Sequence, residues 1–416
     1  MTHLARSSVV LAFVSGGIAG CRSAHAAAHV ADNPPQASAA SSLVDAVIAD
    51  SVRRVLDRAL ANKAFPGAIA IVGTHDRVIT HYAVGHLDWA PSPVPDERTL
   101  WDLASLSKVV GMTSAMIQLV SQGKVSLDAP VQRYLPNWTG PNKNLVTIKH
   151  LLTHTAGLPP DQPPGSKPYD EITHNADSVA MLLFTTPLDT LPGVRMVYSD
   201  VGAYIAGRVV EKVSGQTLDA YVHDHVFEPA GMHETMYKPP ASLIDRIAPT
   251  EVDPRRGGLV RGKVHDERAY YLGGVSAHAG IFSTARDLAR FSQMYLDGGT
   301  IGGVRVLDAN TIKLFTSYVD SSFSDRGIGW QKPDLPGMKY ASPSASWAGH
   351  MMSPRAFGHT GFTGTSIAID PANDIFIVLL SNRVNPTRDN NKITPVRREL
   401  ADAVMSVVLH RPEPRG

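Results

Sequence analysis

Apolar residues recur at helical spacing where the folded part of the chain begins. Over residues 43–60 they fall every three or four positions, which predicts a helix with one buried face that ends before Phe65. Two apolar, β-branched runs follow, Ala68–Val72 and Val78–Val84. The short polar stretch between them is typical of a hairpin. The pattern therefore predicts a helix followed by two paired strands.

A second hairpin is predicted near the other end of the chain. Ser366–Asp370 and Ile375–Ser381 flank a turn, and a closing helix follows from about Val396 to Leu409. Between the two strand-forming ends, residues of about 105–234 show mostly helical patterns joined by Pro and Gly loops. These elements predict an α/β (α+β) fold. One antiparallel sheet is built from both chain ends and flanked by helices, and a mostly helical lobe is inserted.

The first residues have the pattern of a targeting segment. Residues 1–20 carry one positive side chain, the apolar run Val9–Val14 and then small residues, which predicts a signal peptide too short to span a membrane. The four residues that end at Cys21 resemble a bacterial lipoprotein box, which implies lipidation of Cys21. Ordinary secretion, with cleavage after Ala26, is the alternative. Either route predicts an exported protein, periplasmic or anchored to a bacterial membrane through its lipid.

These patterns predict that the chain divides into three parts. Residues 1–20 are the signal peptide, and residues 21–42, rich in Ala, Ser, Pro and His, form a flexible tether. Residues 43–412 form the folded domain, which contains the helical lobe.

Composition narrows the classes of function. The 39 Lys and Arg residues nearly balance the 38 Asp and Glu residues, and no basic block is present, so we expect no nucleic-acid partner. A content of 43% hydrophobic and 19% charged residues is ordinary for a soluble domain and excludes a multi-spanning membrane protein. Cys21 is the single cysteine, so the chain forms no intramolecular disulfide.

Ser105 and Lys108 form a Ser-x-x-Lys pair at the start of a helical pattern. Residues three apart share a helix face, so the lysine amine can reach the serine hydroxyl. A serine hydroxyl becomes a nucleophile when a base takes its proton, and burial favours the neutral, basic form of a lysine. A second copy, Ser121–Lys124, contains a helix-ending glycine and predicts a solvated turn.

Three later segments give the Ser105 pair its context. They are Thr147–Leu158, Tyr198–Asp200 and Gly358–Thr365. In this order the motifs resemble the serine β-lactamase and penicillin-binding-protein superfamily, especially its class C-like branch of esterases, D-amino-acid peptidases and cell-wall amidases. The resemblance extends from Phe65 to Pro386.

The resemblance implies a role for each matching residue. Ser105 would be the nucleophile, and Lys108 with Tyr198 would handle its proton, with the choice of base between these two left open. The backbone amides of Ser105 and Phe362 would form the oxyanion hole. Substrate would be bound by Asp200 and by the triplet His359, Thr360 and Gly361, where glycine lets it approach the strand closely.

Two positions depart from the family pattern. His359 stands where penicillin-recognising members have a charged lysine, and a neutral imidazole holds a substrate carboxylate less well. Asp200 replaces an asparagine, and a carboxylate cannot donate a hydrogen bond to a substrate carbonyl. Asp200 could instead favour the ammonium form of Lys108, which would shift the base role toward Tyr198. Both changes argue against an efficient β-lactamase and favour an esterase-like or amidase-like enzyme.

Other candidate sites carry less weight. His150 and His154 have the spacing of paired zinc ligands, but the intervening carboxylate of such a motif is missing, so both are interpreted as structural. We therefore expect no metal and no cofactor. Trp330 and residues 334–352 either line the mouth of the site or cover the core.

The sequence thus predicts an exported serine hydrolase that forms an acyl-enzyme on a small ester or on an amide derived from peptidoglycan. One alternative is a penicillin-binding protein, a D,D-peptidase or a weak β-lactamase. Another, of a different class, is a non-catalytic binding or sensor module. Substrate identity and oligomeric state are not specified by the pattern.

Overall fold

A computed structural model describes residues 39–161, 175–341 and 345–410. The predicted signal peptide, Cys21 and most of the predicted tether lie outside these residues. Within the described residues, no helix is both long enough and apolar enough to cross a bilayer.

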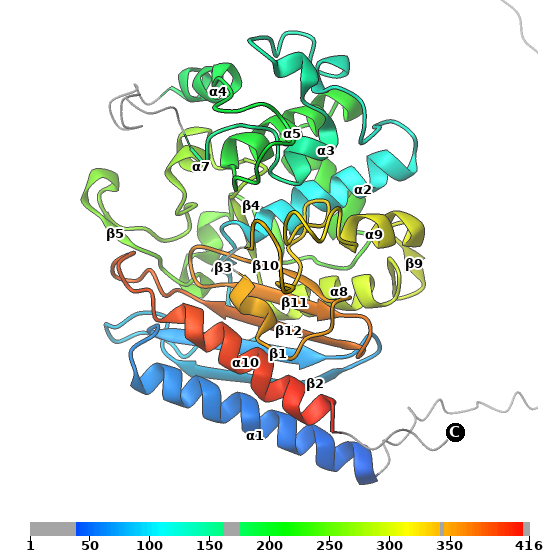
Figure 1. Cartoon of the computed structure of the whole chain (residues 1–416). Helices are drawn as coiled ribbons and strands as arrows, with labels where there is room; N and C mark the ends of the chain where they lie inside the picture. Colours follow the sequence, from blue (N-terminus) through cyan, green and yellow to red (C-terminus); the bar gives the residue numbers. More distant parts are fainter. Residues whose placement is uncertain (1–38, 162–174, 342–344, 411–416) are drawn as a thin grey trace, which may run out of the picture.

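A five-stranded antiparallel sheet forms the centre of the molecule (Figure 1). Its strand order is β10-β11-β12-β1-β2, with bounds Phe357–Thr360, Ser366–Asp370, Ile375–Ser381, Gly67–Gly73 and Val78–Gly85. Strand β1 pairs with β2 on one side and with β12 on the other, where Ala68 lies opposite Ser381. The prediction of one sheet built from both chain ends is confirmed.

Strand β1 is buried along its whole length because both faces of the sheet are covered. Ala68, Ala70 and Val72 belong to the core beneath the terminal helices, whereas Ile69 and Ile71 belong to the core of the helical side. Alternate strand residues point to opposite faces, so one short apolar run contributes to two cores.

The two terminal helices, α1 (Ala39–Ala61) and α10 (Ile393–Val408), lie side by side on one face of the sheet (Figure 1). The opposite face contacts α8 (Ala285–Leu296) and, beyond it, the helical lobe. Both predicted terminal helices are present. Each begins a few residues before its predicted start.

The helical lobe and its connections complete the fold. The remaining α-helices are α2 (Ser114–Ser121), α3 (Ile148–Leu152), α4 (Ala176–Thr185), α5 (Asp200–Ser214), α6 (Leu218–Val222), α7 (Glu267–Tyr271) and α9 (Ala309–Thr316). Two segments are π-helical, Lys108–Thr113 and His223–Phe227. Short 3-10 turns are present at Val131–Arg133, Lys143–Leu145, Ala241–Arg246, Pro254–Arg256 and Ala345–Ala348. The short strands are β3 (Trp101–Asp102), β4 (Met236–Tyr237), β5 (Val252–Asp253), β6 (Gly258–Leu259), β7 (Ile281–Ser283), β8 (Thr300–Ile301) and β9 (Val304–Arg305). Of these, β3, β7 and β4 form a small sheet that leads into the turn at Ser105.

Trp330 belongs to the core. Its side chain is fully buried and packs edge-on against Tyr295 and Phe357, with ring centres 5.1 and 4.9 Å away. Of the two interpretations of this residue, core packing is therefore the correct one. In the described part of the following loop, Trp347 is also buried under the sheet and contacts Gln331.

Candidate active site

Ser105 lies in the turn between strand β3 and the first helix of the lobe. Ala104 before it has a φ of 47°, and the helical backbone starts immediately after Ser105. Lys108, one turn further on, is 1% exposed, and its Nζ atom lies 3.0 Å from the Ser105 Oγ atom. The contact expected from the three-residue spacing is present.

Lys108 is held on three sides. Its Nζ atom donates to the carbonyl oxygen of His278 at 2.9 Å and lies 2.6 Å from Oδ1 of Asp200. Asp200 is the first residue of α5, and its second oxygen is 2.6 Å from Nη2 of Arg268. The carboxylate thus bridges two cations inside the protein.

This geometry determines the charge of the pair. Burial alone would lower the pKa of Lys108, but the charge of Asp200 outweighs it and raises that pKa above its ordinary value. Burial likewise works to raise the pKa of Asp200, and the charges of Lys108 and Arg268 reverse the effect and lower it. Lys108 is therefore an ammonium at neutral pH, as the sequence analysis suggested for an aspartate at this position. The predicted contact between Asp200 and substrate stays a prediction.

Tyr198 stands beside this pair. Its ring centre is 4.9 Å from Nζ of Lys108, and its hydroxyl is buried. The ring of His154 packs against it at 4.5 Å, and Nδ1 of His154 accepts a hydrogen bond from the amide of Ser199 at 3.1 Å. His154 thus orients the chain at Tyr198.

His150 has a similar structural role elsewhere. Its side chain and that of Thr147 cap α3 reciprocally. In the part of the chain that the structure describes, no group of three or more His, Cys, Asp or Glu residues is placed to hold a metal ion.

Strand β10 ends with His359 and Thr360, and Gly361 follows it directly; all three residues line the same pocket as Ser105. His359 is 3% exposed, and burial together with the charges of Arg326 and Lys108 lowers its pKa to about 3. The imidazole is therefore neutral at physiological pH. Its ring centre lies 5.9 Å from that of Tyr198, so it belongs to the same cluster.

Two pockets meet at Ser105. One, of about 390 Å³, is lined by Ser105, Tyr198, His359, Thr360 and Phe362 and by three arginines, Arg326, Arg383 and Arg397. The other, of about 260 Å³, also contains Ser105, Tyr198 and Phe362, but its charged residues include Asp200, Asp266 and Glu267. Ser105 thus lies between an arginine-rich pocket and one with more carboxylates.

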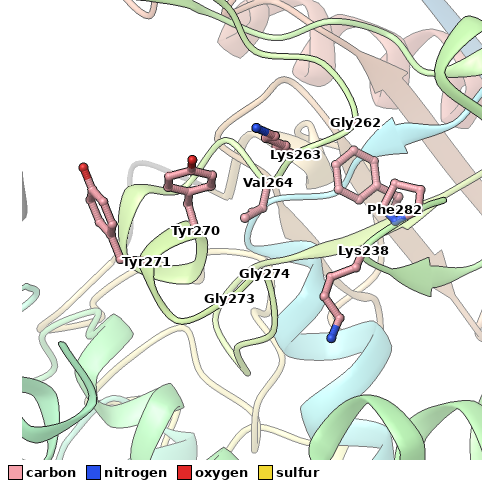
Figure 2. Close-up of a pocket in the computed structure, with 10 residues that line it drawn as sticks. Lys238, Gly262, Lys263, Val264, Tyr270, Tyr271, Gly273, Gly274 and Phe282 are labelled. Atoms are coloured by element: carbon pink, nitrogen blue, oxygen red, sulfur yellow. The ribbon is translucent and has the colours of Figure 1, made fainter. Parts of the chain in front are cut away.

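A further pocket of about 540 Å³ is separate from this cluster (Figure 2). It is lined by residues such as Lys238, Lys263, Tyr270 and Phe282. Ser105, Tyr198 and His359 do not line it, so its size does not make it the catalytic site.

The amides predicted to form the oxyanion hole are available. Within the described residues, neither the Ser105 nor the Phe362 backbone N–H donates a hydrogen bond to another protein group. The structure shows a packing reason for the glycine at position 361. A Cβ atom there would lie 2.1 Å from Oγ1 of Thr365 and 2.4 Å from the carbonyl oxygen of Leu103, so close packing of the protein itself requires glycine. Its predicted contact with substrate stays a prediction.

Arg326 is a residue of the pocket that the motif analysis did not identify. It is 2% exposed, and its guanidinium carbon is 5.5 Å from the centre of the Tyr198 ring. Its Nε and Nη1 atoms are buried and make no hydrogen bond within the described part of the chain, although Nε lies 3.5 Å from Asp325. No motif surrounds Arg326. The one feature of the sequence that could have indicated it is an arginine immediately before the apolar, glycine-rich segment 327–330.

Comparison with known proteins agrees with this geometry. A sequence profile described as Beta-lactamase matches residues 52–402. The chain belongs to the beta-lactamase family. With its Ser105–Lys108 pair, it is a serine hydrolase of that family.

Relatives of this beta-lactamase-family enzyme carry several names. A protein of Escherichia coli K12, provisionally named a D-alanyl-D-alanine carboxypeptidase, is 37% identical over 71% of this chain and 71% of its own length. Among solved structures, the hydrolase EstCE1, which has promiscuous acyltransferase activity, has a TM-score of 0.69 at 24% identity and covers 87% of this chain and 100% of its own. A class C β-lactamase of Rhodobacter sphaeroides has a TM-score of 0.66 at 20% identity, covering 86% of this chain and 99% of its own. These structural similarities establish the class C-like fold.

Proposed function

We propose that this enzyme releases the carboxyl-terminal residue of short, cell-wall-derived peptides through an acyl-enzyme on Ser105. The observation that carries the proposal is Arg326, a buried guanidinium beside Tyr198 that lines the same pocket as Ser105. Its Nε and Nη1 atoms have no hydrogen-bond partner in the described residues, and its ion pair with Asp325 is long, at 3.5 Å. A buried cation with open donor positions is costly unless an anion occupies it in the working complex. A substrate carboxylate meets this requirement, because guanidinium and carboxylate are geometrically matched.

In the proposed reaction, each of these groups has one role. Ser105 Oγ attacks the peptide carbonyl carbon while Tyr198 takes its proton, because Asp200 keeps Lys108 as an ammonium. The amides of Ser105 and Phe362 stabilise the oxyanion. The proton then passes to the leaving amine, the C–N bond breaks, and the acyl group stays on Ser105. Water activated by the same phenolate hydrolyses the ester and restores the free hydroxyl.

The names of the relatives support a carboxypeptidase. The Escherichia coli protein, matched over most of both chains, bears that activity in its name. The charged triplet lysine of penicillin-recognising enzymes is absent here, and Arg326 would supply its positive charge from another segment.

The neutral state of His359 favours a second candidate, an esterase for substrates without a carboxylate. Such substrates would use the same nucleophile and oxyanion hole. They would not depend on Arg326.

The test compares a peptide ending in D-alanyl-D-alanine with its carboxyl-terminal amide. We expect the wild type to prefer the free carboxylate by about 10–100-fold in kcat/KM, the range for a hydrogen-bonded charge pair. Arg326→Met should abolish that preference, Arg326→Lys should retain part of it, and Ser105→Ala should be inactive on both peptides. Equal rates on the two peptides, with faster cleavage of p-nitrophenyl esters, would establish the esterase instead. Stable labelling by a fluorescent penicillin would favour a penicillin-binding protein. Acylation without product release on any substrate would favour a sensor module.

We further propose that the enzyme works outside the cytoplasm, tethered by a lipid on Cys21. The sequence pattern of residues 1–21 supports this, and a cell-wall substrate would be found there. Incorporation of labelled palmitate that disappears in Cys21→Ala is the expected result. A Cys21→Ala variant that stays membrane-bound and labelled would refute the anchor.

A further inference from the structure

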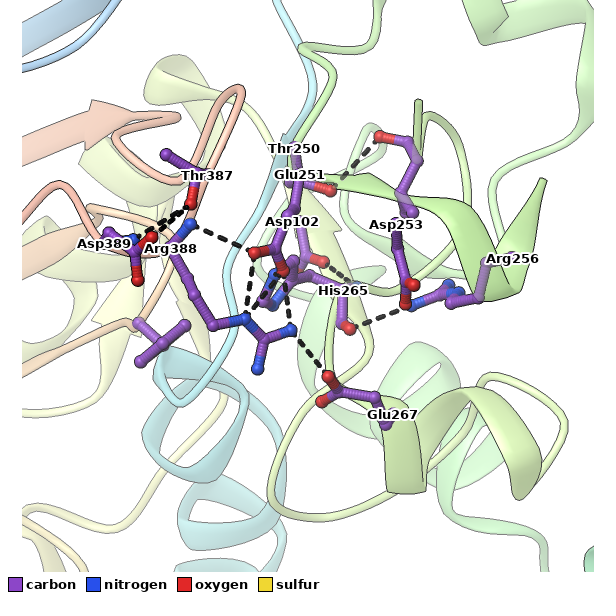
Figure 3. Close-up of polar contacts among 12 residues, drawn as sticks. Asp102, Thr250, Glu251, Asp253, Arg256, His265, Glu267, Thr387, Arg388 and Asp389 are labelled. Carbon is purple, nitrogen blue, oxygen red and sulfur yellow. Dashed lines mark hydrogen bonds and ion pairs between the residues drawn. The ribbon is translucent and has the colours of Figure 1, made fainter. Parts of the chain in front are cut away.

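We propose that Glu251 is a positioning residue that holds the two halves of the oxyanion hole in register. The inference rests on the proposed acyl-enzyme at Ser105. Glu251 immediately precedes strand β5 and lies in a polar network that also contains Asp102, His265 and Arg388 (Figure 3). None of these four residues takes part in the proton transfers described above.

The first link fixes the turn that carries the nucleophile. Asp102 is 3% exposed, and its carboxylate accepts hydrogen bonds from the amide of Ala104 at 2.8 Å and from the amide of His265 at 2.6 Å. Ala104 has a left-handed backbone, which is strained for a residue with a side chain and persists only where surrounding contacts hold it. Asp102 therefore couples the backbone beside Ser105 to the segment at His265.

The second link connects the same segment to the other amide. The ring of His265 stacks on that of Phe362, with centres 5.6 Å apart and planes inclined by 25°. Phe362 is 48% exposed, so its position depends on a small number of contacts. The backbone of His265 is thus linked through Asp102 to the turn at Ser105, and its ring contacts Phe362.

Glu251 holds this histidine in place. Its Oε2 atom lies 2.9 Å from Nε2 of His265 and 2.6 Å from Nη2 of Arg388, and its Oε1 atom accepts the backbone amide of Arg388 at 3.0 Å. The guanidinium of Arg388 is 6.0 Å from the centre of the Phe362 ring. One carboxylate therefore fixes two groups that lie near the Phe362 ring.

Arg383 completes the clamp around Phe362. Its guanidinium lies 4.3 Å from the ring centre, and its Nε atom donates to the Phe362 carbonyl oxygen at 2.8 Å. Its Nη1 atom donates to the carbonyl oxygen of Arg388 at 2.7 Å, so the segment that Glu251 binds also supports Arg383. Removing Glu251 should release His265 and leave the Arg388 side chain held by Glu267, 2.6 Å from its Nη2 atom. Phe362 and its amide would then shift relative to Ser105.

The charge of Glu251 suits this role. Burial works to raise its pKa, but the hydrogen bonds from His265 and Arg388 outweigh burial and lower it. The side chain is consequently ionised at working pH and acts by holding its partners, with no proton to exchange.

The experiment measures kcat per active site, with active sites counted by fluorophosphonate labelling of Ser105. We expect Glu251→Ala to lower kcat by about 10–100-fold with KM changed less than about 3-fold, because small displacements of catalytic donors have effects of this order. Glu251→Gln, which keeps one acceptor oxygen, should lose less. It also serves as the test if the alanine variant does not fold.

Asp253→Ala is the matched control. Asp253 is on the same hairpin and is also paired with an arginine, Arg255, but it does not contact Phe362 or His265. This variant should keep the wild-type kcat per active site.

The possible failures are distinguishable. If Glu251 has only a structural role, Glu251→Ala and Glu251→Gln will have fewer labelled sites but an unchanged kcat per site. That result would overturn the positioning role of Glu251 and leave the proposed function intact. Labelling or turnover that persists in Ser105→Ala would overturn the proposed function and this inference with it.

Discussion

Asp200→Asn is the perturbation that best separates the two candidate bases. It preserves the shape of the side chain and removes the anion that lies 2.6 Å from Nζ of the buried Lys108. At an effective dielectric constant of about 20, two unit charges at this separation attract by about 6 kcal/mol. Without this attraction, burial should dominate and lower the pKa of Lys108.

The assay is the rate of fluorophosphonate labelling of Ser105 as a function of pH. In the wild type, the raised pKa of Lys108 keeps it charged, so this group should produce no change between about pH 6 and 9. In Asp200→Asn, labelling should fall as pH rises within this range, because Lys108 loses its proton and no longer stabilises the phenolate of Tyr198. Asp253→Asn is the control and should follow the wild-type profile.

The opposite slope would refute this assignment. If labelling of Asp200→Asn increases with pH through the same range, neutral Lys108 is the base and Tyr198 is not. A profile unchanged from the wild type would show that Asp200 does not control the charge of Lys108.

Three further predictions concern stability. Gly361→Ala should lower the free energy of unfolding by about 1–3 kcal/mol in chemical denaturation, because its new methyl group overlaps Leu103; an unchanged midpoint would contradict that contact. Trp330→Ala should cost about 3–5 kcal/mol, and a loss below about 1 kcal/mol would contradict its place in the core. The pKa of His359 is about 3 when folded and about 6.5 when unfolded, so the unfolded state binds more protons between these values and stability falls as pH decreases. Between pH 6.5 and 5.0 the wild type should therefore lose about 2 kcal/mol more than His359→Gln, and equal losses would contradict the neutral, buried imidazole.

The strands were predictable from the sequence because their signals are local. Strands β11 and β12 have the bounds that the apolar runs around the second hairpin predict. Helix ends were less predictable. Helix α10 begins at Ile393, before its predicted start. The start was missed because Thr394 and Pro395 interrupt the apolar pattern, but proline is tolerated in the first turn of a helix. Helix α1 begins at Ala39, within a small-residue segment that has no apolar periodicity.

The site was predictable only in part, for a related reason. Ser105 and Lys108 are one helical turn apart, so their spacing alone predicts the contact. Glu251 and Arg388 are 137 positions apart, and their ion pair depends on how distant loops meet in the folded chain. Arg326 is similar, since its importance comes from burial beside Tyr198 and not from its neighbours in the sequence.

The central claim is that Ser105 becomes covalently acylated. The direct measurement is intact-mass analysis after exposure to a fluorophosphonate and to a D-alanyl-D-alanine peptide, followed by mapping of the modified peptide. The account predicts one adduct per chain, located on Ser105 and absent from Ser105→Ala. An adduct on another residue, or substrate turnover that persists in Ser105→Ala, would contradict it.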